Sequence, residues 1–222
     1  METIKNQTFI TDDGSATLFN AQVGEHYHST FGAIGESKHI FIEAGLKPYL
    51  GQSKISIFEV GFGTGLNALL SCKAGAENQI AIHYTAIELF PVSLEVATSL
   101  NYCALLKADQ SVFLKMHSAP EFDDFVSPQF YLKKMQRSFV GLQLQPDIFD
   151  VIYFDAFSPE AQPEMWTVEG FSVLFNALKK GGVLVTYSCK GTVKRALKQA
   201  GFLIEKLPGP PGKREFLRAW KD

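Results

Sequence analysis

Short apolar runs alternate with helix-like stretches along most of this chain. Strands are predicted at four runs rich in apolar and β-branched residues: Ile55–Val60, His83–Leu89, Phe149–Phe154 and Val183–Ser188. Helices are predicted where apolar residues recur at helical spacing or follow start signals: Glu36–Leu46, Leu66–Ala74, Pro91–Ala104, Thr167–Leu178 and Thr192–Ala200. Strands that alternate with helices indicate an α/β protein with a doubly wound, mostly parallel sheet.

The two ends of the chain and one internal region modify this pattern. Near the C-terminus, Phe202–Leu207 and Phe216–Trp220 predict an antiparallel strand pair; with a third strand expected within residues 107–146, the sheet has seven strands. Near the N-terminus, the turn signal Asp12-Asp13-Gly14 predicts a hairpin, and residues 1–50 are expected to form a hairpin and helix that cover a cleft. Residues 107–146 mix helical and strand-like pieces and predict no clear order.

A glycine-rich turn separates the first predicted strand from its helix. Gly61, Gly63 and Gly65 allow positive φ angles and a close approach of a ligand to the backbone, and the helix start offers free N–H groups. A dinucleotide fingerprint needs glycine at the sixth position, where this chain has Leu66. With Glu59 in front, the E-x-G-x-G-x-G spacing instead resembles the glycine motif of S-adenosylmethionine (SAM)-dependent methyltransferases.

Composition narrows the class of protein. At 222 residues, with 46% apolar and 20% charged residues, the chain is expected to form a single domain over residues 1–222. A formal charge of −2 argues against a broadly basic nucleic-acid-binding protein but permits a local basic patch. No apolar run has the length of a membrane span, and no signal-peptide pattern is present. Three scattered cysteines without a CxxC pair indicate a reducing compartment, so a cytoplasmic protein is expected.

Carboxylates stand at and near the ends of the predicted strands. Glu88 comes at the end of His83–Leu89, and ligands of doubly wound sheets bind beyond the carboxyl ends of the strands. A carboxylate there can accept hydrogen bonds from both hydroxyls of a ribose; a solvated strand-end charge is the alternative. Glu59, one residue before Val60, is either a ligand contact or a half-buried carboxylate that fixes the loop.

Asp155 follows the strand Phe149–Phe154 and is predicted to lie over the same cleft. Its surroundings, Asp-Ala-Phe-Ser-Pro, resemble the D-P-P-Y type motif of methyltransferases that act on amines. Methyl transfer from a sulfonium needs a neutral nitrogen lone pair in line with the methyl group, and an acidic side chain can orient the amine and accept its proton. Phe157 can stack on a base or pack against the cofactor. The alternative for Asp155 is a turn former.

Basic residues gather late in the chain, and two interpretations compete for them. The residues concerned are Lys190, Lys194, Lys213 and Arg214. A solvated surface is the commoner explanation, whereas a position near the cleft mouth would let them contact RNA phosphates without reading the sequence.

The histidine-rich segment His26-Tyr27-His28 also allows two interpretations. Together with Glu36 and His39 it can be read as a metal site. The spacing does not match known zinc motifs, so no metal is expected. A lid over the cofactor is the favoured interpretation.

Taken together, the motifs resemble one family. GFGTGLN, the ELF after the second strand, FDAFSPEAQPEMW, GKRE and YHSTFGAIGESKHIFIEAGL cover most of the chain. They are similar to the methyltransferase component of the MnmC/MnmD-type tRNA modification enzymes, which use SAM to methylate the 5-aminomethyl group of 2-thiouridine at the tRNA wobble position. The resemblance implies a Rossmann-like SAM-dependent methyltransferase fold, tRNA as a partner and a cytoplasmic, non-membrane enzyme. Bifunctional members add a flavin-dependent oxidase, for which this chain is too short, so a stand-alone methyltransferase with a separate oxidase is expected.

The resemblance also implies roles for individual residues. The expected cofactor contacts are Tyr27 and Ser29, the methionine-wrapping Gly61, Gly63, Gly65 and Asn67, and the ribose-binding Glu88. Asp155 is expected to face the amine of the modified uridine, and the GKRE loop to shape the substrate pocket. The family usually has an acidic residue after the third strand, near the adenine. Here Lys134–Ser138 contains no aspartate, which leaves adenine recognition open.

Two other functions stay open from the sequence. A small-molecule amine transferase of the spermidine-synthase type shares the acidic end of the fourth strand, and a non-catalytic SAM-binding module would share the glycine turn. The C-terminal basic residues favour RNA over a polyamine, which would need carboxylates there. A wobble base lies in a single-stranded loop, so it can be splayed out and stacked on aromatics such as Phe157 or Trp166.

Overall fold

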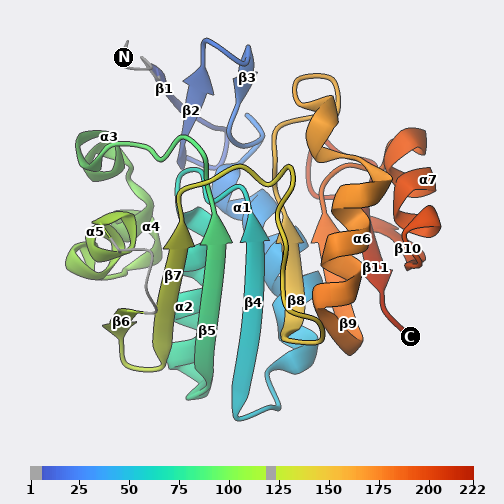
Figure 1. The fold of residues 1–222 in the computed structure, drawn as a ribbon. Helices are drawn as coiled ribbons and strands as arrows, with labels where there is room; N and C mark the ends of the chain where they lie inside the picture. The colour runs from blue at the N-terminus through green and yellow to red at the C-terminus, as the bar shows by residue number, and fades with distance from the viewer. Residues whose placement is uncertain (1–6, 119–123) are drawn as a thin grey trace.

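An eight-stranded sheet forms the centre of the computed structural model, which describes residues 7–118 and 124–222 (Figure 1). Its strand order is β10-β11-β9-β8-β4-β5-β7-β6. The strands are β4 (Lys54–Val60), β5 (Ala81–Ile87), β6 (Asp124–Ser127), β7 (Phe130–Met135), β8 (Phe149–Phe154), β9 (Leu178–Thr186), β10 (Leu203–Pro208) and β11 (Glu215–Trp220). The five from β9 to β7 are parallel, whereas β11, β10 and β6 pair antiparallel. The predicted doubly wound, mostly parallel sheet with an antiparallel terminal pair is confirmed.

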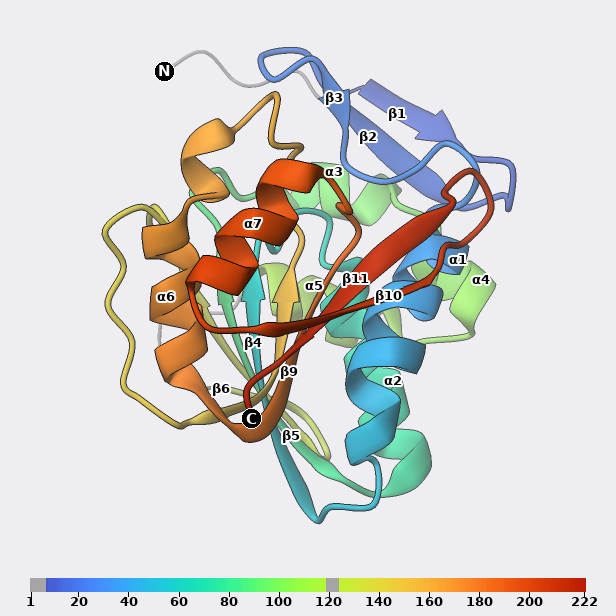
Figure 2. The same cartoon turned by 90° about the vertical axis from the view of Figure 1, so that its right-hand side faces the viewer.

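Helices cover both faces of this sheet, and Figure 2 shows the three layers from the side. The helical elements are α1 (Ala33–Ser37), π-helix η1 (Lys38–Leu46), η2 (Lys47–Tyr49), α2 (Leu66–Asn78), α3 (Leu94–Ser99), α4 (Tyr102–Leu106), α5 (Gln110–Ser118), η3 (Pro163–Met165), α6 (Val168–Ala177) and α7 (Gly191–Gln199). Buried side chains of η1, α2 and α4 share one core cluster, and those of α6 and α7 share the other. Within the described residues, no helix is long and apolar enough to cross a membrane.

Strand β4 illustrates why a nearly continuous apolar run marks the centre of the sheet. Ile55 and Ile57 belong to the core cluster on the α2 side, and Phe58 and Val60 to the cluster on the α6 side. Side chains alternate across a strand, so both faces of a central parallel strand need apolar residues. Glu59 is the exception: it is fully buried on the strand next to the glycine turn.

A small antiparallel sheet lies above the carboxyl ends of the parallel strands in Figure 1. It consists of β1 (Gln7–Ile10), β2 (Ala16–Asn20) and β3 (Glu25–His26) in the order β1-β2-β3. The predicted N-terminal hairpin is therefore confirmed.

Three details differ from the sequence prediction. The sheet has eight strands rather than seven, because β6 pairs with the edge of β7. The helix expected over Pro91–Ala104 is two short helices, because Asn101 hydrogen-bonds to Gly14 and Ala16 of the N-terminal hairpin at the break. The helix expected at Glu36–Leu46 exists, but most of it is π-helical.

Candidate active site

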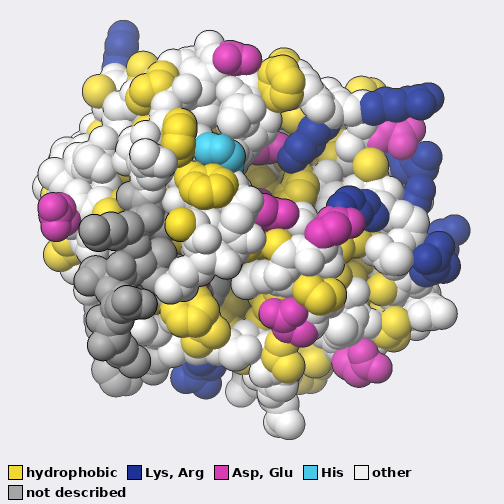
Figure 3. Space-filling model, turned by 90° about the horizontal axis from the view of Figure 1, so that it is seen from above, with side chains coloured by type: hydrophobic (Ala, Val, Ile, Leu, Met, Phe, Trp, Pro, Cys, Tyr) yellow, Lys and Arg dark blue, Asp and Glu magenta, His cyan; other side chains and the backbone are white. Residues whose placement is uncertain are grey.

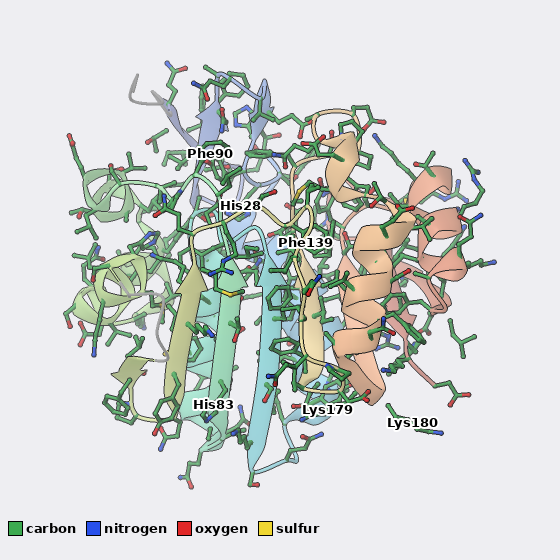
Figure 4. The ribbon with its side chains drawn as sticks, viewed as in Figure 1. His28, His83, Phe90, Phe139, Lys179 and Lys180 are labelled. Carbon is green, nitrogen blue, oxygen red and sulfur yellow. The ribbon has the colours of Figure 1, made fainter. Side chains whose placement is uncertain are left out.

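A cavity of about 540 Å³ opens at the carboxyl ends of β4, β5 and β8. Figure 3 looks down on this end of the sheet. Four parts of the chain contribute most of the lining of the cavity. They are the N-terminal segment 20–29, the strand ends at 60–63, 87–90 and 155–158, residues 137–140 after β7, and the C-terminal Tyr187 and Lys213. In Figure 4 the labelled His28, Phe90 and Phe139 all lie at this end, whereas His83 and Lys179 lie at the other. The cleft is therefore where the strand-end rule for doubly wound sheets places a ligand.

The glycine turn forms one wall of the cleft. Gly61, Gly63 and Gly65 all have positive φ, at 88°, 50° and 75°, respectively. A Cβ at Gly61 would lie 2.5 Å from the carbonyl oxygen of Asp155, and a Cβ at Gly63 would lie 3.1 Å from Tyr27 Cδ1. Both the backbone conformation and the close packing therefore require glycine at these positions. Gly61 and Gly63 line the cavity, whereas Gly65 packs against His117 behind the turn.

Glu88 holds two loops at the mouth of the cleft. It follows β5 directly, and its Oε2 accepts a hydrogen bond from the Gly63 N–H at 2.9 Å. Its Oε1 accepts another from the Phe90 N–H at 2.9 Å. Each carboxylate oxygen has further lone pairs, so Glu88 keeps capacity to accept hydrogen bonds from a ligand.

Asp155 and Glu59 are connected through Asn67. Asn67 Nδ2 donates to Asp155 Oδ2 at 2.8 Å and to Glu59 Oε1 at 2.9 Å. The pKa of Asp155 is raised to about 7, because burial and nearby Glu36 raise it more than the Asn67 bond and Lys213 lower it. Burial also holds the pKa of Glu59 well above its usual value. Asp155 lines the cavity, while Glu59 and Asn67 lie behind its wall.

An ion pair between Lys213 and Glu36 also lines the cleft. Lys213 places its ammonium 4.2 Å from the ring centre of Tyr187. The other oxygen of Glu36 accepts a hydrogen bond from the Ser29 N–H at 2.9 Å. The Tyr187 hydroxyl donates to the carbonyl of Ala156 at 2.9 Å. These bonds connect helix α1, the C-terminal loop and the segment after β8 around one cavity.

The N-terminal sheet is connected to the loop after β8. Glu25 on β3 accepts hydrogen bonds from both the backbone N–H and the hydroxyl of Ser158. Beside this contact, the rings of Tyr27 and Phe157 meet edge to face with centroids 5.0 Å apart. The predicted residues Tyr27 and Phe157 thus lie together in the cleft wall.

The predicted site residues fall into two groups. Those that line the cavity are Tyr27, Ser29, Gly61, Gly63, Glu88, Asp155, Phe157 and Lys213. Those outside the lining are Glu59, Gly65, Asn67, Lys190, Lys194 and Arg214. Lys190 pairs with Glu160 on the surface, and Arg214 is exposed.

Trp166 is not available for stacking on a base. Its side chain is buried against Phe154, with ring centroids 4.8 Å apart, and its indole N–H donates to the carbonyl of Phe157. The expectation that Trp166 serves as a stacking platform is therefore wrong, because its ring belongs to the core on the α6 side.

His28 of the N-terminal segment has a structural partner. His28 Nε2 is hydrogen-bonded to Thr64 Oγ1 at 2.7 Å, and burial lowers the pKa of His28 to about 4, so its ring is neutral. Over residues 7–118 and 124–222, no group of three or more metal-ligating side chains is placed to hold an ion. His28 lines the cavity and fixes the segment that carries Tyr27 to the glycine turn.

Sequence reasoning missed several cavity residues. Glu25, Phe139 and Tyr187 all line the cleft, and Glu36, considered only as a metal ligand, lines it too. Tyr187 follows β9 directly, so the strand-end rule that identified Glu88 would have found it as well. Glu25 carries no local signal, since only the tertiary contact with Ser158 brings it to the cleft.

Comparisons with known proteins show what this chain is similar to. A protein-family model described as S-adenosyl-L-methionine-dependent methyltransferase matches residues 130–222. The crystal structure of MNMC2 from Aquifex aeolicus is 26% identical and has a TM-score of 0.76, covering 99% of this chain and 71% of that chain. Residues 130–222 therefore match the SAM-dependent methyltransferase family, and the whole chain shares its fold with the MNMC2 structure. A spermidine synthase from Thermotoga maritima, with a TM-score of 0.53 and 15% identity, shares the fold alone.

Two curated relatives of this chain bear the same name. The "tRNA 5-methylaminomethyl-2-thiouridine biosynthesis bifunctional protein MnmC" of Paracidovorax citrulli is 30% identical, and the protein of that name from Azoarcus sp. is 29% identical. The matches cover 91% and 93% of this chain but 34% of each relative. The chain thus spans about a third of the length of these relatives.

Proposed function

We propose that this methyltransferase converts 5-aminomethyl-2-thiouridine to 5-methylaminomethyl-2-thiouridine at the wobble position of tRNA. The observation that carries the proposal is the single cleft that contains both Glu88 and Asp155. The carboxylate of Glu88 suits the ribose of the methyl donor, and that of Asp155 suits an incoming amine. The identity of the substrate is proposed from the name of the MnmC relatives.

The residues of the cleft fit SAM. Gly61 and Gly63 leave space that a side chain would fill, and Glu88 retains acceptor capacity for ribose hydroxyls. The acidic side chains that line the cleft outnumber the basic ones. The acidic ones are Glu25, Glu36, Glu88, Asp155 and Glu164, and the basic ones are Arg137 and Lys213. An acidic, partly desolvated cleft favours a cationic ligand, and bound SAM supplies an electrophilic methyl group on a positively charged sulfur. Tyr27 and Ser29 are the further proposed contacts.

We assign Asp155 to the acceptor amine. Methylation needs the free amine, so a nearby base must take up the proton of an ammonium or orient its N–H groups. A carboxyl with a pKa near 7 is well matched to this task at neutral pH. Phe157 and Tyr187 offer aromatic surface for a base extruded from the anticodon loop.

Basic side chains on the α7 side of the cleft are the proposed RNA surface. Figure 3 shows Lys and Arg side chains gathered along that side of the cleft face. Arg195 and Lys198 of α7 and Arg214 of the loop between β10 and β11 are exposed, and Lys194 is half-buried. Contacts of this kind with phosphates position an RNA without reading its bases. Lys190 is proposed to join them, whereas Lys213 is proposed to act inside the cleft.

The curated relatives are named as bifunctional proteins, so we infer that a second activity prepares the amine substrate. We propose that a separate flavin-dependent oxidase supplies it and that both proteins act in the cytoplasm. The adenine contact is proposed for 137–140 after β7, because these residues line the cleft.

Methyl-labelled SAM tests the function directly. The protein is incubated with tRNA from cells that lack this methyltransferase activity, and the nucleosides are separated and identified by mass spectrometry. Label is expected in 5-methylaminomethyl-2-thiouridine and absent with Asp155→Asn. A parallel reaction with spermidine or putrescine in place of tRNA tests the small-molecule alternative. Label on a polyamine, or on another nucleoside, would refute the proposal.

A further inference from the structure

One buried amide connects two carboxyl groups behind the cleft. Glu59 comes from β4, Asn67 from α2 and Asp155 from the loop after β8. The two N–H groups of the Asn67 amide reach Glu59 Oε1 at 2.9 Å and Asp155 Oδ2 at 2.8 Å. Asn67 is 3% exposed, and Glu59 is completely buried. The three side chains therefore form one linked unit that touches the cavity only through Asp155.

The amide of Asn67 is committed to this unit. An asparagine amide has two N–H donors, and here each is used by a different carboxyl group. Within the described structure, the buried Oδ1 of Asn67 and Oε2 of Glu59 have no hydrogen-bond partner. Buried polar atoms without partners cost free energy, so an arrangement that keeps them needs a compensating purpose.

We propose that Asn67 and Glu59 are positioning residues for Asp155: Asn67 fixes one carboxylate oxygen and leaves the other for the acceptor amine, and neutral Glu59 fixes Asn67. The inference rests on the proposed role of Asp155 in the methyl-transfer reaction. It assigns to Asn67 a task behind the wall, in place of the expected contact with the methionine part of SAM.

The charges around Asp155 explain why such a unit is useful. The groups that act on Asp155 electrostatically come from several elements: Glu36, Glu59, Tyr84, Tyr187 and Lys213. Glu36 and burial favour the protonated form of Asp155, whereas Asn67 and Lys213 favour the ionised form. A hydrogen bond that stabilises only the ionised carboxylate keeps its pKa near neutrality, where a proton acceptor works best.

Glu59 contributes as a neutral acceptor rather than as a charge. Burial is the largest cause that raises its pKa, and the charge of Asp155 raises it further. Two ionised carboxylates on one amide would repel each other in a region of low dielectric constant. With Glu59 protonated, the unit carries at most one negative charge, and that charge resides on the residue that lines the cavity.

Carbon-13 NMR of carboxyl-labelled aspartate tests the proposal without RNA or turnover. The Asp155 signal is assigned by its loss in Asp155→Asn and titrated in wild type, Asn67→Ala, Glu59→Gln and the control Asn78→Ala. Asn78 lies on the same helix, and among residues 7–118 and 124–222 its side chain bonds to the Ala74 carbonyl rather than to a carboxyl group. The Asp155 midpoint is expected to rise by about one to two pH units in Asn67→Ala, because a hydrogen bond to the ionised group is lost. It should stay within about half a unit of wild type in the other two variants.

An unchanged Asp155 midpoint in Asn67→Ala would overturn the proposal. A fall in that midpoint by more than about half a unit in Glu59→Gln would overturn the neutral role of Glu59, because it would show that a charge was removed. Should Asn67→Ala not fold, Asn67→Ser is titrated instead, with the same expected rise. In the labelled-SAM assay the rate of Asn67→Ala should reach half its maximum at a correspondingly higher pH. A missing tRNA product with a shifted midpoint would refute the proposed function and leave the unit intact.

Discussion

Replacing Gly61 with alanine would press a methyl group against the backbone that carries Asp155. The new Cβ would lie 2.5 Å from the Asp155 carbonyl oxygen, 3.0 Å from its carbonyl carbon and 3.3 Å from the Ala156 nitrogen. None of these atoms belongs to a flexible side chain, so either the glycine turn or the loop after β8 must move. The Asp155 N–H also donates to the Val60 carbonyl at 2.9 Å, and this bond would be strained by the same movement.

The expected cost of Gly61→Ala has two parts. A non-glycine residue at positive φ costs about 1–3 kcal/mol, and overpacking against surroundings that cannot yield costs about 1–3 kcal/mol more. Gly181→Ala is the matched control, because Gly181 has a φ of 75°, compared with 88° for Gly61, and nothing lies within 4 Å of its added Cβ. The control should therefore carry the first cost alone.

Urea unfolding measures the difference between the two variants. Gly61→Ala should lose about 1–3 kcal/mol more of its free energy of unfolding than Gly181→Ala, with similar denaturant slopes. Methyl transfer should fall in Gly61→Ala under conditions where the protein is fully folded, and should stay at the wild-type level in Gly181→Ala, which lies at the opposite end of β9. Equal losses of stability would refute the packing argument, and full activity in folded Gly61→Ala would show that Asp155 does not depend on this contact.

Three further predictions concern individual charges. Glu88→Ala should weaken SAM binding about 10- to 100-fold in calorimetry, since hydrogen bonds to a charged group contribute about 1.5–3 kcal/mol; an unchanged Kd would remove Glu88 from the ribose site. Because the pKa of Asp155 rises from 3.8 unfolded to about 7 folded, its contribution to stability is present below pH 4 and is lost as pH rises to about 7. Asp155→Asn should therefore lose less stability than wild type between about pH 4 and 7 in urea titrations, and parallel pH profiles would contradict the shifted pKa. The double variant Lys194→Ala, Arg214→Ala should bind tRNA more weakly with a log–log salt slope reduced by about one to two, with SAM affinity unchanged; an unaltered slope would exclude these side chains from phosphate contact.

Local signals explain why the centre of the fold and of the cleft could be predicted. The strand, glycine turn and helix around Gly61 are encoded within a few residues, and the apolar run of β8 marks a strand buried on both faces. Parallel strands bring their carboxyl ends to one edge, so Glu88 and Asp155 could be placed in one cleft without knowledge of any tertiary contact.

Tertiary contacts explain what could not be predicted. Asn101 ends a helix by bonding to the N-terminal hairpin, and no local pattern reports that partner. The residues next to Trp166 in the sequence do not indicate that its ring is buried in the core. The family resemblance implied a ligand contact for Asn67, and no local pattern reports that its side chain bonds to two carboxyl groups behind the glycine turn.

The bond between Glu36 and Lys213 joins positions 177 residues apart. A ribosome producing this protein releases the Glu36 segment long before the lysine that neutralises it. Until that lysine arrives, closing the pocket would trap an uncompensated carboxylate, which is costly in a buried setting. Completion of the pocket therefore has to wait until the segment with Lys213 has been synthesised, so a polypeptide that stops before it would be poorly suited to capture the methyl donor.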